Sequence, residues 1–213
     1  MARIVEWPQQ TAAQSAVATD AAAVLEHGGL VVYPTDTVYG LGALPGDPAA
    51  IQRIYEVKGR PDEKAIIWLL AGLGSIEGAC EVDSRVSRLT EAFWPGALTL
   101  ILRRLQPPPG AIQTQGVRVP AHPAALAVIR AAGGCVATTS ANRSGEPSAR
   151  NAAEAASTIG SRVDLILDAG PAPGGTESTI LDLSSDPPRV LRHGAISAEE
   201  LESVMGSAVQ RPA

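Results

Sequence analysis

The sequence has little of what marks several large classes of protein. It contains two cysteines, Cys80 and Cys135, which lie far apart and form no C-x-x-C or Cys/His motif. A disulfide framework or a structural zinc site is therefore not expected, and a reducing cytoplasm fits this cysteine usage better. The longest nearly apolar run, residues 65–74, is about half a membrane span, and the N-terminus has no apolar signal region. We expect a cytoplasmic protein without membrane association.

Aromatic residues and positive charge are also scarce. One Phe, three Trp and three Tyr occur in 213 residues, so the core must be mostly aliphatic. The formal net charge of −5 argues against binding nucleic acid through bulk positive charge. With 45% hydrophobic and 18% charged residues, the composition is that of a globular protein.

Several familiar motifs are missing as well. The chain has no G-x-x-x-x-G-K-[ST] phosphate loop, and Gly40-Leu41-Gly42 does not continue as G-x-G-x-x-G. It has neither H-E-x-x-H nor G-x-S-x-G. The three histidines are scattered, so neither a metal cluster nor a Ser/His/Asp triad is predicted. Any nucleotide site must be built from other residues.

Helical and extended patterns alternate along the chain. Helices are expected near residues 15–27, 48–57, 84–93, 123–132, 151–159 and 197–205. Strands are expected near residues 30–34, 65–70, 97–104, 116–120, 135–139, 164–168, 178–183 and 189–193. This order predicts an α/β fold with one open, twisted, mixed sheet flanked by helices. We expect a single domain over residues 10–200 and a short, loose tail over 206–213.

The basic residues are unevenly chosen. Of 17, only two are lysines, and both fall within KGRPDEK at residues 58–64. Lys58, Arg60 and Lys64 therefore share one short loop after a predicted helix. Such a cluster suits a polyphosphate, because Arg binds phosphate as a fork and Lys as a compact charge. Balancing the dipole at the helix C-terminus is the alternative, and it would explain Lys58 but not Lys64.

Two polar segments follow buried strands. YPTDTVYGLGA (33–43) has hydroxyls at a strand's carboxyl end and then a predicted glycine-rich turn. Ligands are often bound at such a position, although a Ser/Thr turn would give the same pattern. In CVATTSANRSGEPS (135–148), alternation puts Thr138, Ser140 and Asn142 on one side, where they could bind phosphate or a small polar substrate. An ordinary Ser-Gly turn is the alternative there.

Three further polar residues project from predicted strands. Arg118 lies between Val117 and Val119. If the valine side is buried, the guanidinium projects from the other side, where a carboxylate would pair with it. Ser178 and Arg192 have similar positions in their strands. A solvent-exposed polar side chain is the alternative for each.

Taken together, the chain resembles the YrdC-like threonylcarbamoyl-AMP synthases over about residues 15–197. The motifs that follow in the order of that family are YPTDTVYGLGA, KGRPDEK, FWPGALTLIL, GVRVPAHP, TTSANRSGEPS, ESTILDL and VLRHGAI. The resemblance implies a YrdC-like fold with a concave, positively charged cavity. It also implies that L-threonine, bicarbonate and ATP, carried with Mg²⁺, give threonylcarbamoyl-AMP and pyrophosphate. A separate transferase complex would then use the product to modify ANN-decoding tRNAs with threonylcarbamoyladenosine.

The resemblance also implies site residues. The Lys-Arg-Ser-Asn set around the triphosphate and the reacting centre would be Lys58, Arg60, Ser140 and Asn142. Positions that match threonine contacts are Thr35, Arg118, Thr138 and Ser178, with Arg118 facing the carboxylate. Positions that match further nucleotide contacts are Asp62, Thr114, Ser148 and Arg192. Some relatives have His near position 68, where this chain has Trp68. Longer members add a C-terminal domain, so the chain is expected to be the short form.

The residue types fit this chemistry. The amine of threonine can add to carbon dioxide or bicarbonate without a protein nucleophile, and the carbamate oxygen can then attack the α-phosphorus. Such a reaction needs positioning and charge neutralisation more than acid–base groups. No acidic pair with metal-site spacing stands out, so Mg²⁺ would be held mainly by the ATP phosphates.

Three other functions remain open from the sequence. One is a nucleotide-binding paralogue of the same fold without this activity, and another is a carbamoyl-transfer domain that adenylates carbamoyl phosphate. The third is an RNA-binding module, for which steep salt dependence would be the sign. The acidic net charge and the few aromatic residues count against RNA readout. Direct tRNA binding and the oligomeric state are not predicted.

Overall fold

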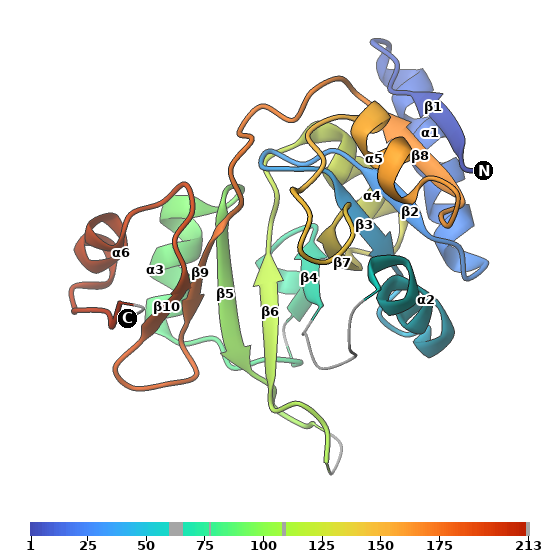
Figure 1. Cartoon of the computed structure of the whole chain (residues 1–213). Coiled ribbons are helices and arrows are strands. Elements are labelled where there is room, and N and C mark those ends of the chain that lie inside the picture. Colours follow the sequence, from blue (N-terminus) through green and yellow to red (C-terminus); the bar gives the residue numbers. More distant parts are fainter. Residues whose placement is uncertain (60–65, 77, 108–109, 212–213) are drawn as a thin grey trace.

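The protein is described here from a computed structural model, in residues 1–59, 66–76, 78–107 and 110–211. In these residues, one ten-stranded sheet has the order β1-β8-β2-β3-β7-β4-β6-β5-β9-β10 (Figure 1). The strands are β1 (Arg3–Glu6), β2 (Val31–Tyr33), β3 (Gly40–Ala43), β4 (Ile67–Leu70), β5 (Leu98–Arg103), β6 (Thr114–Arg118), β7 (Cys135–Ser140), β8 (Leu165–Asp168), β9 (Thr179–Asp182) and β10 (Arg189–Arg192). Parallel and antiparallel pairs alternate irregularly, so the predicted mixed sheet is confirmed.

Local signals in the sequence explain where the helices begin and end. The helices are α1 (Thr11–Glu26), α2 (Pro48–Lys58), α3 (Ser84–Phe93), α4 (Pro123–Ala131), α5 (Ala152–Ile159) and α6 (Ala198–Met205), with a short 3-10 helix at Leu73–Ile76. Asp47 caps α2 by accepting the N–H groups of Ala49 and Ala50, each at 3.0 Å. Gly59 ends that helix with a φ of 59°, a value that favours glycine. No helix in the described ranges has both the length and the apolar composition of a membrane span.

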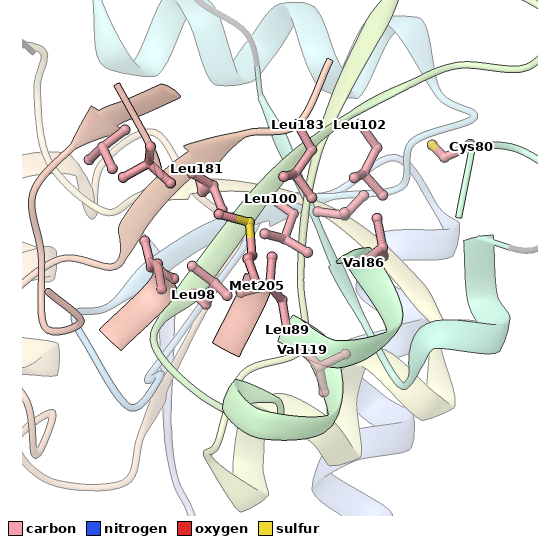
Figure 2. Close-up of a cluster of buried hydrophobic side chains, with 14 of the residues drawn as sticks. Cys80, Val86, Leu89, Leu98, Leu100, Leu102, Val119, Leu181, Leu183 and Met205 are labelled. Carbon is pink, nitrogen blue, oxygen red and sulfur yellow. The ribbon is translucent and has the colours of Figure 1, made fainter. Parts of the chain in front are cut away.

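The helices cover the two faces of the sheet unequally. Leu98, Leu100 and Leu102 of β5 point toward α3 and α6, where they form one aliphatic cluster with Leu89 and Met205 (Figure 2). At the other half of the sheet, α2 and α5 pack on one face and α1 and α4 on the opposite face. Because successive residues of a strand point to opposite faces, the residues that alternate with the β5 leucines face away from α3 and α6.

The segment at residues 40–43 is a strand, which corrects the predicted glycine-rich turn. It forms β3 and pairs antiparallel with both β2 and β7. Gly42 is required by its neighbours, because a Cβ atom there would lie 2.8 Å from Tyr33 Cε1 and 2.9 Å from Val136 Cγ1. Glycine in this strand therefore reflects close packing of side chains from β2 and β7, a long-range feature.

Residues near both ends of the described chain pair with the sheet. The edge strand β1, which was not predicted, pairs parallel with β8. The tail expected over 206–213 is not loose in its described part, residues 206–211, since Gln210 exchanges backbone hydrogen bonds of 2.8 Å with Pro188 and Val190. Val209 is buried, and its N–H donates to Glu202 Oε1 at 3.0 Å. The domain limits 10–200 stay a prediction, with paired residues on either side of them.

Truncation of Leu100 tests the cluster under α3 and α6. We expect Leu100→Ala to lower the free energy of unfolding by about 2–5 kcal/mol, because it leaves a cavity beneath two helices. Leu191→Ala, on β10 where the side chain is 43% exposed, is the matched control and should cost less than about 1 kcal/mol. Urea denaturation of both variants measures the difference. Equal losses would contradict this account of the core.

Candidate active site

A cavity of about 210 Å³ lies on the face of the sheet that α3 and α6 leave open. It receives side chains from β4, β5, β6, β7, β9 and β10, and from the loop between β2 and β3. Its apolar lining includes Ile67, Leu69 and Ile180. The polar groups that line it are Thr35, Thr37, Thr99, Arg118, Thr138, Thr139, Ser140, Glu177, Ser178 and Arg192. Such a mixture of apolar wall and converging polar groups is typical of a small-molecule site.

Lys58 ties the end of α2 to the loop after β7. Its Nζ donates to the backbone oxygens of Ser140 and Asn142 at 2.7 and 2.9 Å, and to Asn142 Oδ1 at 2.9 Å. Ser140 Oγ in turn donates to Asn142 Oδ1 at 2.6 Å. The structure thus brings together three members of the predicted set. The fourth, Arg60, lies outside the described residues, as do Asp62 and Lys64.

Arg118, at the end of β6, is almost completely buried. Its Nη2 donates to Asp36 Oδ1 at 2.6 Å, its Nη1 to Thr37 Oγ1 at 2.9 Å and its Nε to the Gly96 oxygen at 2.8 Å. Burial lowers the pKa of Arg118, and the Asp36 carboxylate offsets part of this effect. The guanidinium stays charged, because its ordinary pKa lies far above neutrality. Three of its five N–H groups are used in these bonds, and within the described residues the other two donate no further hydrogen bond.

The sequence predicted a carboxylate partner for Arg118, and the protein supplies one itself. Asp36 was noted only as part of a hydroxyl-rich segment, yet its side chain accepts from Arg118 and also from the Ala121 N–H at 2.9 Å. The segment that contains Asp36 is therefore fixed to β6 and to the start of α4. Sequence reasoning missed this role, because a pairing across 82 residues leaves no local pattern.

Two of the predicted threonine contacts use their hydroxyl groups within the protein. Thr35 Oγ1 accepts from the N–H groups of Thr37 and Val38 and donates to the Val38 oxygen. This is the Ser/Thr turn that was the alternative for this segment. Thr138 Oγ1 donates to the Val136 oxygen at 3.1 Å and lies 2.6 Å from Tyr33 Oη. Burial raises the pKa of Tyr33, so its hydroxyl keeps the proton.

A second hydrogen-bond network is centred on Glu177 and Arg192. Glu177 accepts from Ser148 Oγ at 2.8 Å and forms an ion pair with Arg192. Arg192 also donates to the oxygen and Oγ of Ser178, each at 3.0 Å, and Ser178 Oγ lies 2.8 Å from Thr99 Oγ1. Ser148, Ser178 and Arg192 were predicted, whereas Glu177 and Thr99 were missed. Thr99 could have been found as the single polar residue inside the apolar strand ALTLIL.

Thr114 and Trp68 lie away from this cavity. Both line a separate cavity of about 170 Å³, which also has Tyr55 and Arg104 in its wall. The guanidinium carbon of Arg104 is 5.3 Å from the Trp68 ring centroid, which is cation–π geometry. Thr114 therefore does not line the cavity that Arg192, another predicted nucleotide contact, lines.

Each of the two arginines that line the 210 Å³ cavity has a carboxylate partner. Arg118 pairs with Asp36 and Arg192 with Glu177. A positively charged cavity therefore stays a prediction. Within the described part of the chain, no group of three or more His, Cys, Asp or Glu side chains is arranged to hold a metal ion.

Comparison with known proteins shows which family this chain is similar to. The Sua5/YciO/YrdC family model, described as "Telomere recombination", matches residues 23–194. The threonylcarbamoyl-AMP synthase of Bacillus subtilis (strain 168) is 42% identical over 192 residues, which cover 87% of this chain and 56% of that protein. The protein of the same name from Pyrococcus abyssi is 40% identical over 198 residues, covering 91% of this chain and 58% of that protein.

A solved structure agrees with these sequence matches. The crystal structure of P. abyssi Sua5 complexed with L-threonine superposes with a TM-score of 0.89 and 36% identity, over 99% of this chain and 62% of that one. The chain thus spans between 56% and 62% of the length of these relatives. The match over residues 23–194 exceeds half of the sequence, and so the chain belongs to the Sua5/YciO/YrdC family.

Proposed function

We propose that the protein is an L-threonylcarbamoyladenylate synthase, which converts L-threonine, bicarbonate and ATP carried with Mg²⁺ to threonylcarbamoyl-AMP and pyrophosphate. The observation that carries this proposal is that Lys58 binds both Ser140 and Asn142, while Ser140 lines the same cavity as the buried guanidinium of Arg118. The names of the B. subtilis and P. abyssi relatives support the same reading.

Threonine would bind in the 210 Å³ cavity. The two remaining N–H groups of Arg118 suit its carboxylate, because charge-assisted hydrogen bonds are the strong ones. Ser178 and the other hydroxyl groups of the lining suit its polar atoms, while Ile67 and Ile180 provide apolar surface for its methyl group. Thr35 and Thr138 would contribute mainly by shape, since their hydroxyl groups already have partners.

ATP would bind across the rim formed by the loop after β7. Lys58, Ser140 and Asn142, with Arg60, would surround the triphosphate, and Ser148 and Arg192 would add contacts to the nucleotide. We extend the proposal to Asp62 and to Thr114 on the basis of the family motif alone. Mg²⁺ enters as part of the substrate, held mainly by the phosphate oxygens.

The chemistry then needs orientation and charge neutralisation. The threonine amine forms an N–C bond to the carbon of carbon dioxide and gives up a proton, which leaves a carbamate. With bicarbonate the same N–C bond forms while a C–O bond breaks, and the departing hydroxide takes the amine proton and leaves as water. A carbamate oxygen forms a bond to the α-phosphorus as the bond to the β-phosphate oxygen breaks, and pyrophosphate leaves with the electron pair. Lys58, Arg60 and Arg192 would stabilise negative charge on the phosphates and hold the reacting atoms in line.

We also propose the cellular role that follows from this product. A separate transferase complex in the cytoplasm would pass the threonylcarbamoyl group to ANN-decoding tRNAs. The acidic net charge of −5 supports a small-molecule role for this chain rather than binding of tRNA by bulk charge.

Pyrophosphate release is the direct test. We expect release from MgATP only when both L-threonine and bicarbonate are present, with serine and valine much less effective. Release that instead depends on carbamoyl phosphate would make the protein a carbamoyl-transfer relative. Folded protein that binds ATP without any release would leave a nucleotide-binding paralogue and reject the proposal.

The Arg118→Lys variant tests the threonine side. A lysine can neutralise Asp36 but cannot donate to Asp36, Thr37 and Gly96 while also presenting a fork to a carboxylate. We expect the KM for threonine to rise about 30-fold or more, with a far smaller change in the KM for ATP. Arg130→Lys, at the exposed end of α4, is the control and should behave like the wild type. A selective rise in the KM for ATP would contradict this assignment.

The Lys58→Met variant tests the nucleotide side. Loss of Nζ leaves the oxygens of Ser140 and Asn142 without their donor. We expect turnover to fall about 100-fold or more and stability to fall by about 1–3 kcal/mol. Gln52→Met, exposed on the same helix, should change neither quantity. Steady-state pyrophosphate release and urea denaturation provide the two readouts, and normal turnover by Lys58→Met would refute the role.

A further inference from the structure

Glu177 stands between two cavities. Its side chain lines the 210 Å³ cavity together with Ser178 and Arg192. It also lines a neighbouring cavity of about 310 Å³, whose wall includes Ser148 and Arg150. One carboxylate oxygen accepts from Ser148 Oγ and the other from Arg192 Nη1. Both oxygens of Glu177 are thus used to hold residues that come from different segments.

The hydrogen bonds continue without a break from one side of the site to the other. Ser148 follows β7, Glu177 precedes β9, and Arg192 ends β10. Beyond Arg192 the contacts pass to Ser178 and then to Thr99, which is fully buried in β5. Ser148 and Arg192 belong to the proposed nucleotide side, whereas Ser178 belongs to the proposed threonine side. Glu177 is the member that joins the two sides.

We propose that Glu177 is a positioning residue that couples the binding of nucleotide to the binding of threonine. The proposal rests on the function given above for the identity of the two ligands. Glu177 lines both cavities, but its two carboxylate oxygens are engaged by Ser148 and Arg192, so in this proposal it acts by fixing these two residues. Arg192 then presents Ser178 to the amino acid.

The exposure of the ion pair explains why the coupling should be positive. The side chains of Arg192 and Glu177 are 38% and 36% exposed, so without ligands their attraction is screened by water and the pair is weak. A nucleotide beside Ser148 and Arg192 would exclude that water. Hydrogen bonds strengthen in such a less polar environment, and the geometry around Ser178 would then be fixed before threonine arrives. The conformational entropy of the network is lost when the first ligand binds, so the second ligand binds with a smaller entropy loss.

Calorimetric titration of threonine, without and with a saturating non-hydrolysable MgATP analogue, measures this coupling. We expect the nucleotide to lower the Kd for threonine at least about fivefold in the wild type. In Glu177→Gln the ratio of the two Kd values should lie within about twofold of one, because the ion pair with Arg192 is lost. By reciprocity, threonine should change the Kd for the analogue by the same factor in each protein.

Glu146→Gln is the matched control. Glu146 is an exposed glutamate in the wall of the same 310 Å³ cavity, so its substitution removes an equal charge from the same rim. The control should keep the wild-type ratio. Thr99→Val breaks the chain at its far end with little change in shape and should also reduce the ratio, even if Glu177→Gln proves unstable in thermal denaturation.

The outcomes separate this inference from the proposed function. A wild-type ratio of one, or an undiminished ratio in both Glu177→Gln and Thr99→Val, would overturn the coupling role while normal pyrophosphate release left the function intact. A wild type that binds neither ligand would reject the function and the inference together. An equal loss in Glu146→Gln would show an effect of overall charge and would also reject the role of Glu177.

Discussion

Arg118 is 4% exposed, and a guanidinium buried to this degree must have hydrogen-bond acceptors and a negatively charged partner. The groups that supply them hold the segments around the site in place. Asp36, Thr37 and Gly96, which lie in two loops, accept the hydrogen bonds of Arg118. The loop that carries Asp36 is tied in turn to the glycine-rich segment at 171–175, because Gly174 and Gly175 donate backbone N–H groups to the oxygens of Asp36 and Thr37. That segment leads directly to Glu177 and Ser178. The buried ion pair thus fixes both rims of the cavity.

The pairing of charges suggests how such a site selects its ligands. Each arginine of the 210 Å³ cavity already has a carboxylate partner, so an arriving anion meets oriented N–H groups rather than bare positive charge. Oriented donors in a partly enclosed site discriminate by geometry as well as by charge. A carboxylate at Arg118 and a nucleotide at Arg192 would each complete a set of hydrogen bonds that the protein has already begun. This arrangement suits a reaction that joins two polar substrates without a protein nucleophile.

Much of the fold could be predicted from the sequence, because it is encoded locally. The cap at Asp47-Pro48 and the capping box at Ser197 define their helices within one or two residues. The glycines of β3 misled the prediction, since their cause is packing against side chains from β2 and β7. In the site, motif spacing found Lys58 but not Glu177. The partners of Glu177 lie 29 and 15 residues away, on segments that meet only once the sheet has formed.

The alternation of side chains along β4 also shows which face of the sheet Trp68 occupies. The family resemblance implies His near position 68 in some members, where this chain has Trp68. Ile67 and Leu69 line the 210 Å³ cavity, and Trp68 between them points to the opposite face, where it packs beside the α3–α6 cluster and under Arg104. Its register partners, Val117 and Ala137, share that orientation. A change of residue at position 68 therefore acts on the cavity of about 170 Å³ that contains Thr114, and leaves the surface around Arg118 as it is.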